Sequence, residues 1–424
     1  MTDAAMPAML RLMNQDHRDV IIIGGGLIGL TQALALAEHG LSSHVVDRAD
    51  PQAMLAADFD GRTSAISSSS YNLFEAIGLA GRLDGKGCRV EQIWVSDQMK
   101  PGALDFVPSE DKGFLGQMFE NSLLRRTLYD AAAAHDLIAL HMPATITAKT
   151  RGAAGVQVTL ENGDELTGNL LIAAEGRRSA TREEEGIRTA SWKYEHSAIV
   201  GAIFHEKPHR NIAYEIFYQT GPFAVLPMLD AADDAGVMRH RSAIVWSQTR
   251  ADAPAYLKLS SRGFAAELHK AMGGMLGDVQ LATPLSTYPL GFHHAGQITG
   301  ERLALIGDSA HGIHPIAGQG LNLGLRDVAA LTQVLVEGAR LGLDAGDAQL
   351  LARYQSWRAI DILSVALATD TLNRIHSAPG KAASAVRRFG MGLIQRAAPI
   401  KNLLMSEARG ESGDLPVLLK GSQI

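Results

Sequence analysis

The sequence predicts an α/β plus β fold, in which a unit of parallel strands and helices carries an inserted β-sheet and ends in a helical C-terminal region. Three observations support this fold class. A buried apolar run, a glycine turn and a helical run open the chain after Asp19, strand-like runs dominate residues 197–247, and the residues after Gly320 are mainly helical in pattern. At 424 residues the chain exceeds one small core, so we expect about two or three domains or one large interleaved fold.

The composition is ordinary for a globular protein, with 46% hydrophobic residues, 20% charged residues and a net charge of -6. This balance argues against a surface built for polyanions, so we expect no nucleic acid partner. Cys88 is the single cysteine, which excludes an internal disulfide and fits a reducing compartment. No window reaches the roughly 18 uninterrupted apolar residues that cross a bilayer, and residues 1–18 lack a secretory signal. We therefore expect a cytoplasmic protein, either free or held peripherally on the inner face of the membrane.

The elements follow from hydrophobic periodicity. Residues 20–23 form a buried parallel strand, residues 28–39 a helix and residues 43–47 a second strand. The further elements, in chain order, are a helix at 71–82, a strand at 92–97, a helix at 122–135, a small antiparallel meander at 145–147, 156–160 and 165–167, a buried strand at 170–174, β-rich runs at 199–204, 213–218, 223–226 and 242–246, and a buried strand at 302–306.

The turn after the first strand has the spacing of a dinucleotide-binding motif. Gly24, Gly26 and Gly29 follow G-x-G-x-x-G, a pattern that permits a tight turn, brings backbone N–H groups close to a pyrophosphate and lets the helix pack on the strand. Asp47 stands 21 positions after Gly26 (47 − 26), near the usual spacing of about 20 for the acid that binds ribose. The alternative is a glycine-rich turn without a ligand. The candidate contacts of this unit are Gly24, Gly26, Leu27, Ile28, Gly29, Asp47 and Arg48.

A second motif indicates a long cofactor. Residues 305–311 (Leu-Ile-Gly-Asp-Ser-Ala-His) close a predicted strand, and residues 315–322 (Pro-Ile-Ala-Gly-Gln-Gly-Leu-Asn) lead into a helix. Together with the string at 314–327, this pattern resembles the flavoprotein aromatic hydroxylases, and specifically their ubiquinone-biosynthesis branch. The resemblance covers most of the chain. It implies the para-hydroxybenzoate hydroxylase-like fold, with a Rossmann-like FAD-binding domain and an inserted β-sheet substrate domain.

The resemblance also implies the domain limits. The FAD-binding domain would be assembled from 19–80, from 111–190, which includes the meander, and from 297–345. A substrate-side segment at 81–110, a substrate-binding β-sheet domain at 191–296 and a helical C-terminal region at 346–424 would complete the chain.

The resemblance implies that Asp308 hydrogen-bonds the ribityl and pyrophosphate region of FAD and that the loop after it passes beside the isoalloxazine ring. Backbone N–H groups that open the helix near Gly320 would stabilise the negative charge of the reduced flavin. A plain loop-to-helix turn is the alternative. None of these residues is a covalent nucleophile; the candidates on the flavin side are Pro315, Gly318, Gln319, Gly320, Leu321 and Asn322.

Two arginines extend the expected site. Arg62, in the segment 60–65, matches a family position that approaches the pyrophosphate, and Arg125 is a weaker candidate for a cofactor contact; a surface arginine is the alternative. One departure is Glu175, which stands where the family usually has Asp and puts nucleotide affinity or donor docking in question. A structural helix cap at Ser179 is an equal interpretation of this segment.

Other residues leave alternatives open. His311 and His314 lack accompanying carboxylates or cysteines, so we expect no metal, and they would shape the loop or face the substrate cavity. The apolar runs at 221–227 and 288–290 either face the far side of the flavin or fill a sheet core. The basic and apolar stretch at 387–405 would lie on a membrane surface, on a partner protein or on the chain's own core.

The activity implied by the resemblance is aromatic hydroxylation. FAD, reduced by NAD(P)H or by a protein carrier, would react with O2 to give a flavin hydroperoxide and pass one oxygen atom to the ring of a polyprenylated phenol in ubiquinone biosynthesis. Two alternatives stay open: a flavin-dependent reductase or dehydrogenase on the same fold, and a non-catalytic member of an assembly of quinone-biosynthesis proteins.

Overall fold

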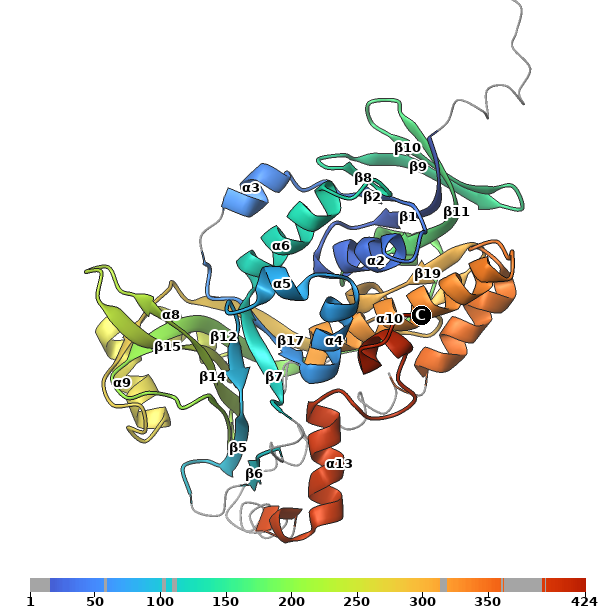
Figure 1. The fold of residues 1–424 in the computed structure, drawn as a ribbon. Coiled ribbons are helices and arrows are strands. Elements are labelled where there is room, and N and C mark those ends of the chain that lie inside the picture. The colour runs from blue at the N-terminus through green and yellow to red at the C-terminus, as the bar shows by residue number, and fades with distance from the viewer. Residues whose placement is uncertain are drawn as a thin grey trace, which may run out of the picture.

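The computed structural model describes residues 16–56, 59–100, 104–108, 113–312, 319–359, 361, 391–392 and 394–424. The predicted α/β plus β class is confirmed. A parallel sheet with helices lies on one side of the molecule and a large antiparallel-rich sheet on the other, as Figure 1 shows.

The first sheet has the strand order β18-β19-β11-β1-β2-β8, and β10 and β9 extend it from β11. Its central strands run parallel, so their carboxyl ends share one edge. The bounds are β1 Asp16–Ile23, β2 Ser43–Val46, β8 Ile138–His141, β9 Ile146–Gly152, β10 Gly155–Leu160, β11 Glu165–Ala173, β18 Thr299–Gly300 and β19 Leu303–Leu305.

Three helices pack around this sheet: α2 (Leu27–Ala37), α6 (Asn121–Ala133) and α10 (Gln319–Arg340). The second half of β1, residues 20–23, is an uninterrupted apolar run because both of its faces are covered, and Val20, Ile21 and Ile22 have no exposed surface. The Gln32 side-chain amide of α2 donates a hydrogen bond to Thr332 of α10 at 2.8 Å, which fixes these two helices to each other.

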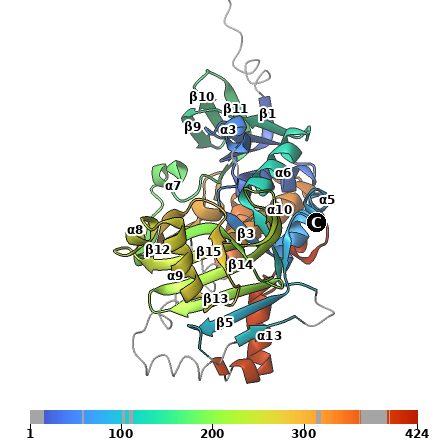
Figure 2. The same cartoon turned by 90° about the vertical axis from the view of Figure 1, so that its left-hand side faces the viewer.

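The second sheet, called here the substrate sheet, has nine strands in the order β20-β17-β12-β15-β14-β13-β5-β6, with β16 beside β12. Helices α8 (Ala253–Leu257) and α9 (Ser261–Ala271) cover its outer side, as Figures 1 and 2 show. The strands are β5 Gln92–Asp97, β6 Leu104–Phe106, β12 Thr189–His205, β13 Ile212–Tyr218, β14 Gly221–Ala232, β15 Met238–Thr249, β16 Val279–Leu281, β17 Ser286–Ala295 and β20 His311–Gly312.

A third, three-stranded sheet lies between these two parts, in the order β3-β7-β4. Its strands are β3 (Thr63–Ser67), β7 (Gly116–Glu120) and β4 (Cys88–Val90). Ala65 of β3 and Met118 of β7 pack in one apolar cluster with Ala213 and Leu226 of the substrate sheet. The face of the substrate sheet opposite α8 and α9 is therefore turned toward β3, and we call it the inner face.

Two predicted elements differ from the structure. The helix expected at 71–82 is two helices, α4 (Ser68–Ala76) and α5 (Ala80–Leu83), because Gly78 adopts φ 73° just after α4 and ends it. The strands expected at 165–167 and 170–174 are one strand, β11. Gly168 between them is not a turn: a Cβ there would lie 3.0 Å from the Arg18 carbonyl oxygen, so glycine permits the close approach of β1.

The remaining short elements connect these sheets or follow them: α3 (Pro51–Ala56), α7 (Ala180–Glu184), the 3-10 turn η2 (Gly307–Ser309), α13 (Ala398–Ala408) and the 3-10 turn η4 (Val417–Lys420). Within the described ranges, no helix is both long enough and apolar enough to cross a membrane.

Candidate functional site

The two glycine-bearing turns meet at one edge of the parallel sheet. Strands β1, β11 and β19 are neighbours, and Gly24 and Gly307 directly follow the carboxyl ends of β1 and β19. A Cβ on Gly307 would lie 3.2 Å from Cγ1 of Ile28, and a Cβ on Gly324 would lie 2.7 Å from Cδ1 of the same side chain. Ile28 at the start of α2 is thus packed between the Asp308 turn and α10, and the turns form one surface.

The three glycines of the G-x-G-x-x-G motif differ in whether packing requires glycine at the position. Gly24 has φ 111°, and a Cβ there would collide with the Ala174 carbonyl. A Cβ on Gly29 would collide with the Gly24 carbonyl, so these two glycines are needed for the fold itself. Gly26 is exposed, has φ −77°, and its Cβ would meet no atom within 4 Å. Packing does not require glycine at this position, and the open space at a helix N-terminus fits a closely bound pyrophosphate.

Asp47 fixes the glycine turn from the end of β2. Its Oδ2 accepts a hydrogen bond from the Gly25 N–H at 2.6 Å, and its Oδ1 accepts one from the Ala49 N–H at 2.8 Å. A carboxylate has about four acceptor sites, so capacity for a ribose hydroxyl remains. Arg48, which follows it, is exposed, and Leu27 is half-buried in the first turn of α2.

The Asp308 turn is held by its neighbours. The Asp308 side chain is 44% exposed and pairs with Arg177, whose Nε lies 3.2 Å from Oδ2. Nε2 of His293 lies 2.7 Å from the Asp308 carbonyl oxygen. The Gly307 N–H donates to Oδ2 of Asp327 at 2.8 Å, which ties the turn to α10.

Asp327 is the centre of a buried charge cluster that sequence reasoning missed. Its Oδ2 lies 2.6 Å from Nε2 of His311, and its Oδ1 accepts from Nε of Arg358 at 2.7 Å. Burial acts to raise the pKa of Asp327, but the charges of His311 and Arg358 outweigh it and hold the pKa below its ordinary value. His311 therefore shapes the loop, the first of the two roles expected for it. In the described part of the chain no three potential ligands group around a metal position.

Arg62, just before β3, and Arg125 of α6 lie close enough to each other for their charges to interact. Nε of Arg62 donates to Oδ2 of Asp60 at 2.6 Å, while Nε of Arg125 is buried and has no hydrogen-bond partner among the described residues. Burial lowers the pKa of Arg125, and the positive charge of Arg62 lowers it further. An unpaired guanidinium nitrogen next to a second cation fits an anion such as a phosphate group.

Glu175 is part of a helix cap. Its Oε2 accepts hydrogen bonds from the Ser179 hydroxyl at 2.6 Å and from the Thr181 N–H at 3.2 Å, and Ser179 in turn caps α7. The guanidinium of Arg182 donates to the Ser309 carbonyl at 2.9 Å, which joins this segment to the Asp308 turn. The structure thus contains the cap that the sequence left as one of two interpretations, and the longer Glu side chain is accommodated in it.

The start of α10 faces the free edge of β3. The Asn322 side chain accepts from the Ser67 N–H at 2.9 Å and donates to the Ala65 carbonyl at 2.8 Å. Strand β3 is an edge strand: β7 pairs with one of its edges along the whole of its length, and no described strand pairs with the other edge. This edge and the first turn of α10, which holds Gln319, Gly320 and Leu321, would border a planar ring. Pro315, Gly318 and His314 lie outside the described residues.

The run at 221–227 fills a sheet core in part, which is one of the two interpretations that the sequence left open; that the run also faces the flavin stays a prediction. Phe223 and Val225 of β14 pack in the core under α9, whereas Leu226 packs with the cluster around Ala65 and Met118 on the inner face. Alternation along the strand divides the two roles. In the run at 288–290, Tyr288 is exposed and Leu290 is buried.

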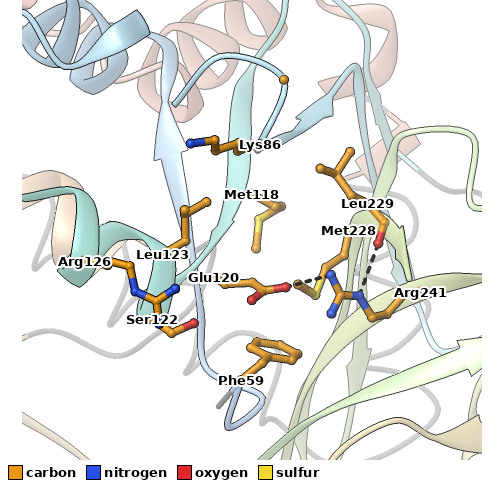
Figure 3. A pocket seen from close by; sticks show the side chains of 11 residues that line it. Phe59, Lys86, Met118, Glu120, Ser122, Leu123, Arg126, Met228, Leu229 and Arg241 are labelled. Carbon is orange, nitrogen blue, oxygen red and sulfur yellow. Dashed lines mark hydrogen bonds and ion pairs between the residues drawn. The ribbon is translucent and has the colours of Figure 1, made fainter. Parts of the chain in front are cut away.

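A cavity of about 420 Å³ lies where the three-stranded sheet, α6 and the substrate sheet meet. Figure 3 shows Arg241 reaching across it to Glu120, with an ion pair at 2.7 Å, and Phe59 below this pair. The Arg241 guanidinium carbon lies 5.0 Å from the centre of the Phe59 ring. The glycine turns do not line this cavity. The ion pair joins β7 of the three-stranded sheet to β15 of the substrate sheet, and no sequence spacing predicts that Glu120 pairs with Arg241.

Known proteins resemble this chain over nearly its whole length. Residues 17–362 match the family model described as FAD binding domain. Ubiquinone hydroxylase UbiL of Rhodospirillum rubrum is 41% identical over 392 residues, which cover 92% of this chain and 89% of that protein. The 3-demethoxyubiquinol 3-hydroxylase of Escherichia coli is 30% identical over 402 residues, covering 94% and 100%. The structure of p-nitrophenol 4-monooxygenase PnpA from Pseudomonas putida superposes with a TM-score of 0.76 at 14% identity, covering 95% of this chain and 100% of that one, which shows a shared fold.

Proposed function

Because the chain belongs to the FAD-binding domain family and is a FAD-dependent monooxygenase of the ubiquinone-hydroxylase kind, we propose that it hydroxylates the aromatic ring of a polyprenylated phenol in ubiquinone biosynthesis. The observation that carries this proposal is the single surface formed by the Gly24 turn and the Asp308 turn, with open space in front of Gly26. A surface of this kind matches a long cofactor with a pyrophosphate at its middle. The alternatives of a reductase or a non-catalytic assembly member find no support in the names of these relatives.

The residues around the nucleotide turns would bind FAD in separate ways. N–H groups at the start of α2, from Gly26 to Ile28, would donate to the pyrophosphate, helped by the helix dipole. Arg62 and Arg125 would neutralise its charge, Asp47 would accept from a ribose hydroxyl, and Asp308 would accept from the ribityl hydroxyls.

The flavin ring would lie between β3 and the start of α10. When bound and reduced, FAD would supply the electrons that activate O2, and one atom of that O2 reaches the substrate. Backbone N–H groups of Gly320, Leu321 and Asn322 would stabilise negative charge on the ring, and the loop with Pro315, Gly318 and Gln319 would lie against it. Apolar side chains of the inner face, such as Leu226, would exclude water from the reacting atoms.

The electron donor would be NAD(P)H or a protein carrier.

The C-terminal helix α13 would contact the membrane that holds a polyprenylated substrate. Leu404 and Met405 of α13 pack on the chain's own core. Ile400 and Leu403 of the same helix are 50% and 61% exposed. Exposed apolar side chains next to Lys401 suit the interfacial region of an anionic membrane.

A direct experiment supplies purified protein with FAD, a reductant and a polyprenylated phenol, in air and under nitrogen, and follows the phenol by mass spectrometry. The proposal predicts a product with one additional oxygen atom in air and none under nitrogen. Turnover under nitrogen with a different electron acceptor would instead identify a reductase. FAD-loaded protein that gives no product in air, yet binds quinone-biosynthesis proteins, would identify a non-catalytic component.

A further inference from the structure

Glu215 lies on the inner face of the substrate sheet, in the middle of β13. Ala213, two positions earlier, packs with Ala65 of β3 and Met118 of β7, whereas Ile216 packs in the core under α9. Side chains alternate along a strand, so Glu215 shares the face of Ala213. This face is turned toward β3, the strand whose free edge would border the flavin ring, because Ala213 and Leu226 on it pack with Ala65 of β3.

The strands beside Glu215 place small apolar side chains around it. Val95 of β5 and Ala224 of β14 are its direct cross-strand neighbours, and the same row continues through Val245 of β15 to Val200 of β12. Glu215 and the three valines are half-buried, in contrast to the fully covered residues under α9. The row is therefore an apolar surface with residual access, and Glu215 is its one ionisable group.

Glu215 makes no hydrogen bond or ion pair within the described ranges of the chain. Burial alone raises its pKa to about 7. A carboxylate in apolar surroundings without a partner is costly unless another group uses it. Burial is the one cause of this shift, so no titratable group on the surrounding elements contributes to it. These groups are Cys88 and Arg89 of β4, Asp97 of β5, Asp105 of β6, Glu120 of β7, Lys193, Tyr194, Glu195, His196 and His205 of β12, Tyr214 and Tyr218 of β13 itself, Asp230 of β14, Arg239, His240 and Arg241 of β15, and Lys401 and Glu407 of α13.

We propose that Glu215 is a catalytic residue whose carboxylate accepts a hydrogen bond from the phenolic hydroxyl of the substrate and then takes up the proton of that hydroxyl. This inference rests on the proposed function. The O–H bond of the phenol breaks, the proton binds a carboxylate oxygen of Glu215, and the electron pair stays on the phenol oxygen. The phenolate makes the ring carbon beside or opposite that oxygen a better nucleophile toward the oxygen atom that is transferred. The ring carbon that gains the oxygen atom loses its hydrogen as a proton, and this proton ends on the second oxygen atom of O2, which leaves as water. Glu215 then returns its own proton to the phenol oxygen, so the step needs only the O2 and the reductant of the proposed function.

The residue type and its surroundings suit this role. A general base works best when its pKa is near the working pH, and a carboxylate in an apolar setting reaches that range. The same apolar row would contact the ring and its hydrocarbon tail. A purely structural Glu215 would serve neither purpose, because it forms no bond that holds described strands together.

The test compares Glu215→Gln, which keeps the size and removes the charge, with Glu195→Gln, the same change at an exposed position on β12. Wild type should show kcat falling on the acid side with an apparent pKa near 7. Glu215→Gln should lower kcat by about 10²- to 10⁴-fold and lose this acid limb. The KM of Glu215→Gln should rise far less than its kcat falls, its FAD content should match that of wild type, and its unfolding temperature should be no lower, because the carboxylate has no described protein partner to lose. All properties of Glu195→Gln should match those of wild type. Glu215→Asp should retain the acid limb at reduced kcat.

A second readout needs no turnover. A phenol without the polyprenyl tail should bind FAD-loaded wild type more weakly as the pH falls below about 7, because protonation of Glu215 removes the charged acceptor of its hydroxyl hydrogen bond. The Kd of Glu215→Gln for this phenol should not change with pH in the same range. Wild-type kcat with an intact acid limb in Glu215→Gln, or the same pH dependence of Kd in both proteins, would overturn the role of Glu215. Absence of product from wild type would refute the proposed function instead, and the pH dependence of Kd would still decide whether Glu215 receives the phenolic hydroxyl.

Discussion

Replacing Gly26 by alanine should weaken FAD binding without weakening the fold. The backbone at Gly26 has φ −77° and ψ −174°, an extended conformation that alanine adopts readily. The new Cβ would meet no protein atom within 4 Å. It would instead occupy the space through which a pyrophosphate approaches the N–H groups of α2.

The size of the effect follows from these contacts. Alanine at a helix N-cap in place of glycine costs up to about 1 kcal/mol, and the lower flexibility of the unfolded chain offsets about 0.4–1 kcal/mol, so the free energy of unfolding of the apoprotein should change little. Loss of one charge-assisted hydrogen bond to the pyrophosphate costs about 1.5–3 kcal/mol. The Kd for FAD should therefore rise about 10- to 150-fold.

The assay titrates apoprotein with FAD and follows the change in flavin fluorescence, alongside thermal unfolding of the apoprotein. Gly152→Ala is the matched control, because its Cβ also enters open space and the residue lies in the β9–β10 hairpin, away from the turns. Gly29→Ala should behave differently and lower the unfolding temperature, since its Cβ would collide with the Gly24 carbonyl. An unchanged Kd for FAD in Gly26→Ala would refute the placement of the pyrophosphate.

Three further predictions concern the rest of the site. Arg125→Met should raise the Kd for FAD about tenfold or more without lowering the unfolding temperature of the apoprotein, because its Nε has no partner in the described part of the chain. Arg126→Met on the exposed side of α6 is the control, and equal effects of the two changes on the Kd would contradict the assignment. Asp327→Asn should reduce the free energy of unfolding by about 3–5 kcal/mol at neutral pH. Since the pKa of Asp327 is lowered in the folded state, wild type should lose its extra free energy of unfolding over Asp327→Asn as the pH falls below about 4. A difference in free energy of unfolding between the two proteins that stays constant in acid would argue against the cluster. Ile400→Ser with Leu403→Ser should reduce co-sedimentation with anionic vesicles about tenfold, while Leu341→Ser with Leu343→Ser should not; binding that resists the first pair would exclude α13 as the contact.

The parts of the fold that sequence predicts here are those specified by local pattern. The strand at 20–23 and the helix after Gly26 follow from an apolar run and a glycine turn that need no distant partner to be recognised. Gly78 and Gly168 show the limit of local pattern. The first ends a helix that periodicity would continue, and the second permits close packing of β1 where composition indicates a turn.

The candidate site divides in the same way. Gly24, Gly26 and Asp308 stand in motifs whose spacing points to a nucleotide, and the structure brings them to one sheet edge. Their roles toward FAD stay predictions. Asp327 could not be found from spacing, because its partners His311 and Arg358 lie in other parts of the chain. Glu215 could not be found either, because what distinguishes it is that it has no described partner. A charged residue inside the alternating strand 212–218 is the one signal that marks Glu215 in the sequence.

The central claim, that one FAD bound across both turns transfers oxygen from O2 to a phenol ring, is tested most directly by labelling. Purified FAD-loaded protein is given a reductant, a polyprenylated phenol and ¹⁸O-labelled dioxygen in unlabelled water, and the product is analysed by mass spectrometry. The account predicts one ¹⁸O atom in each newly hydroxylated ring. A hydroxyl oxygen derived from water, or a ring left unchanged by flavin-loaded protein, would contradict it.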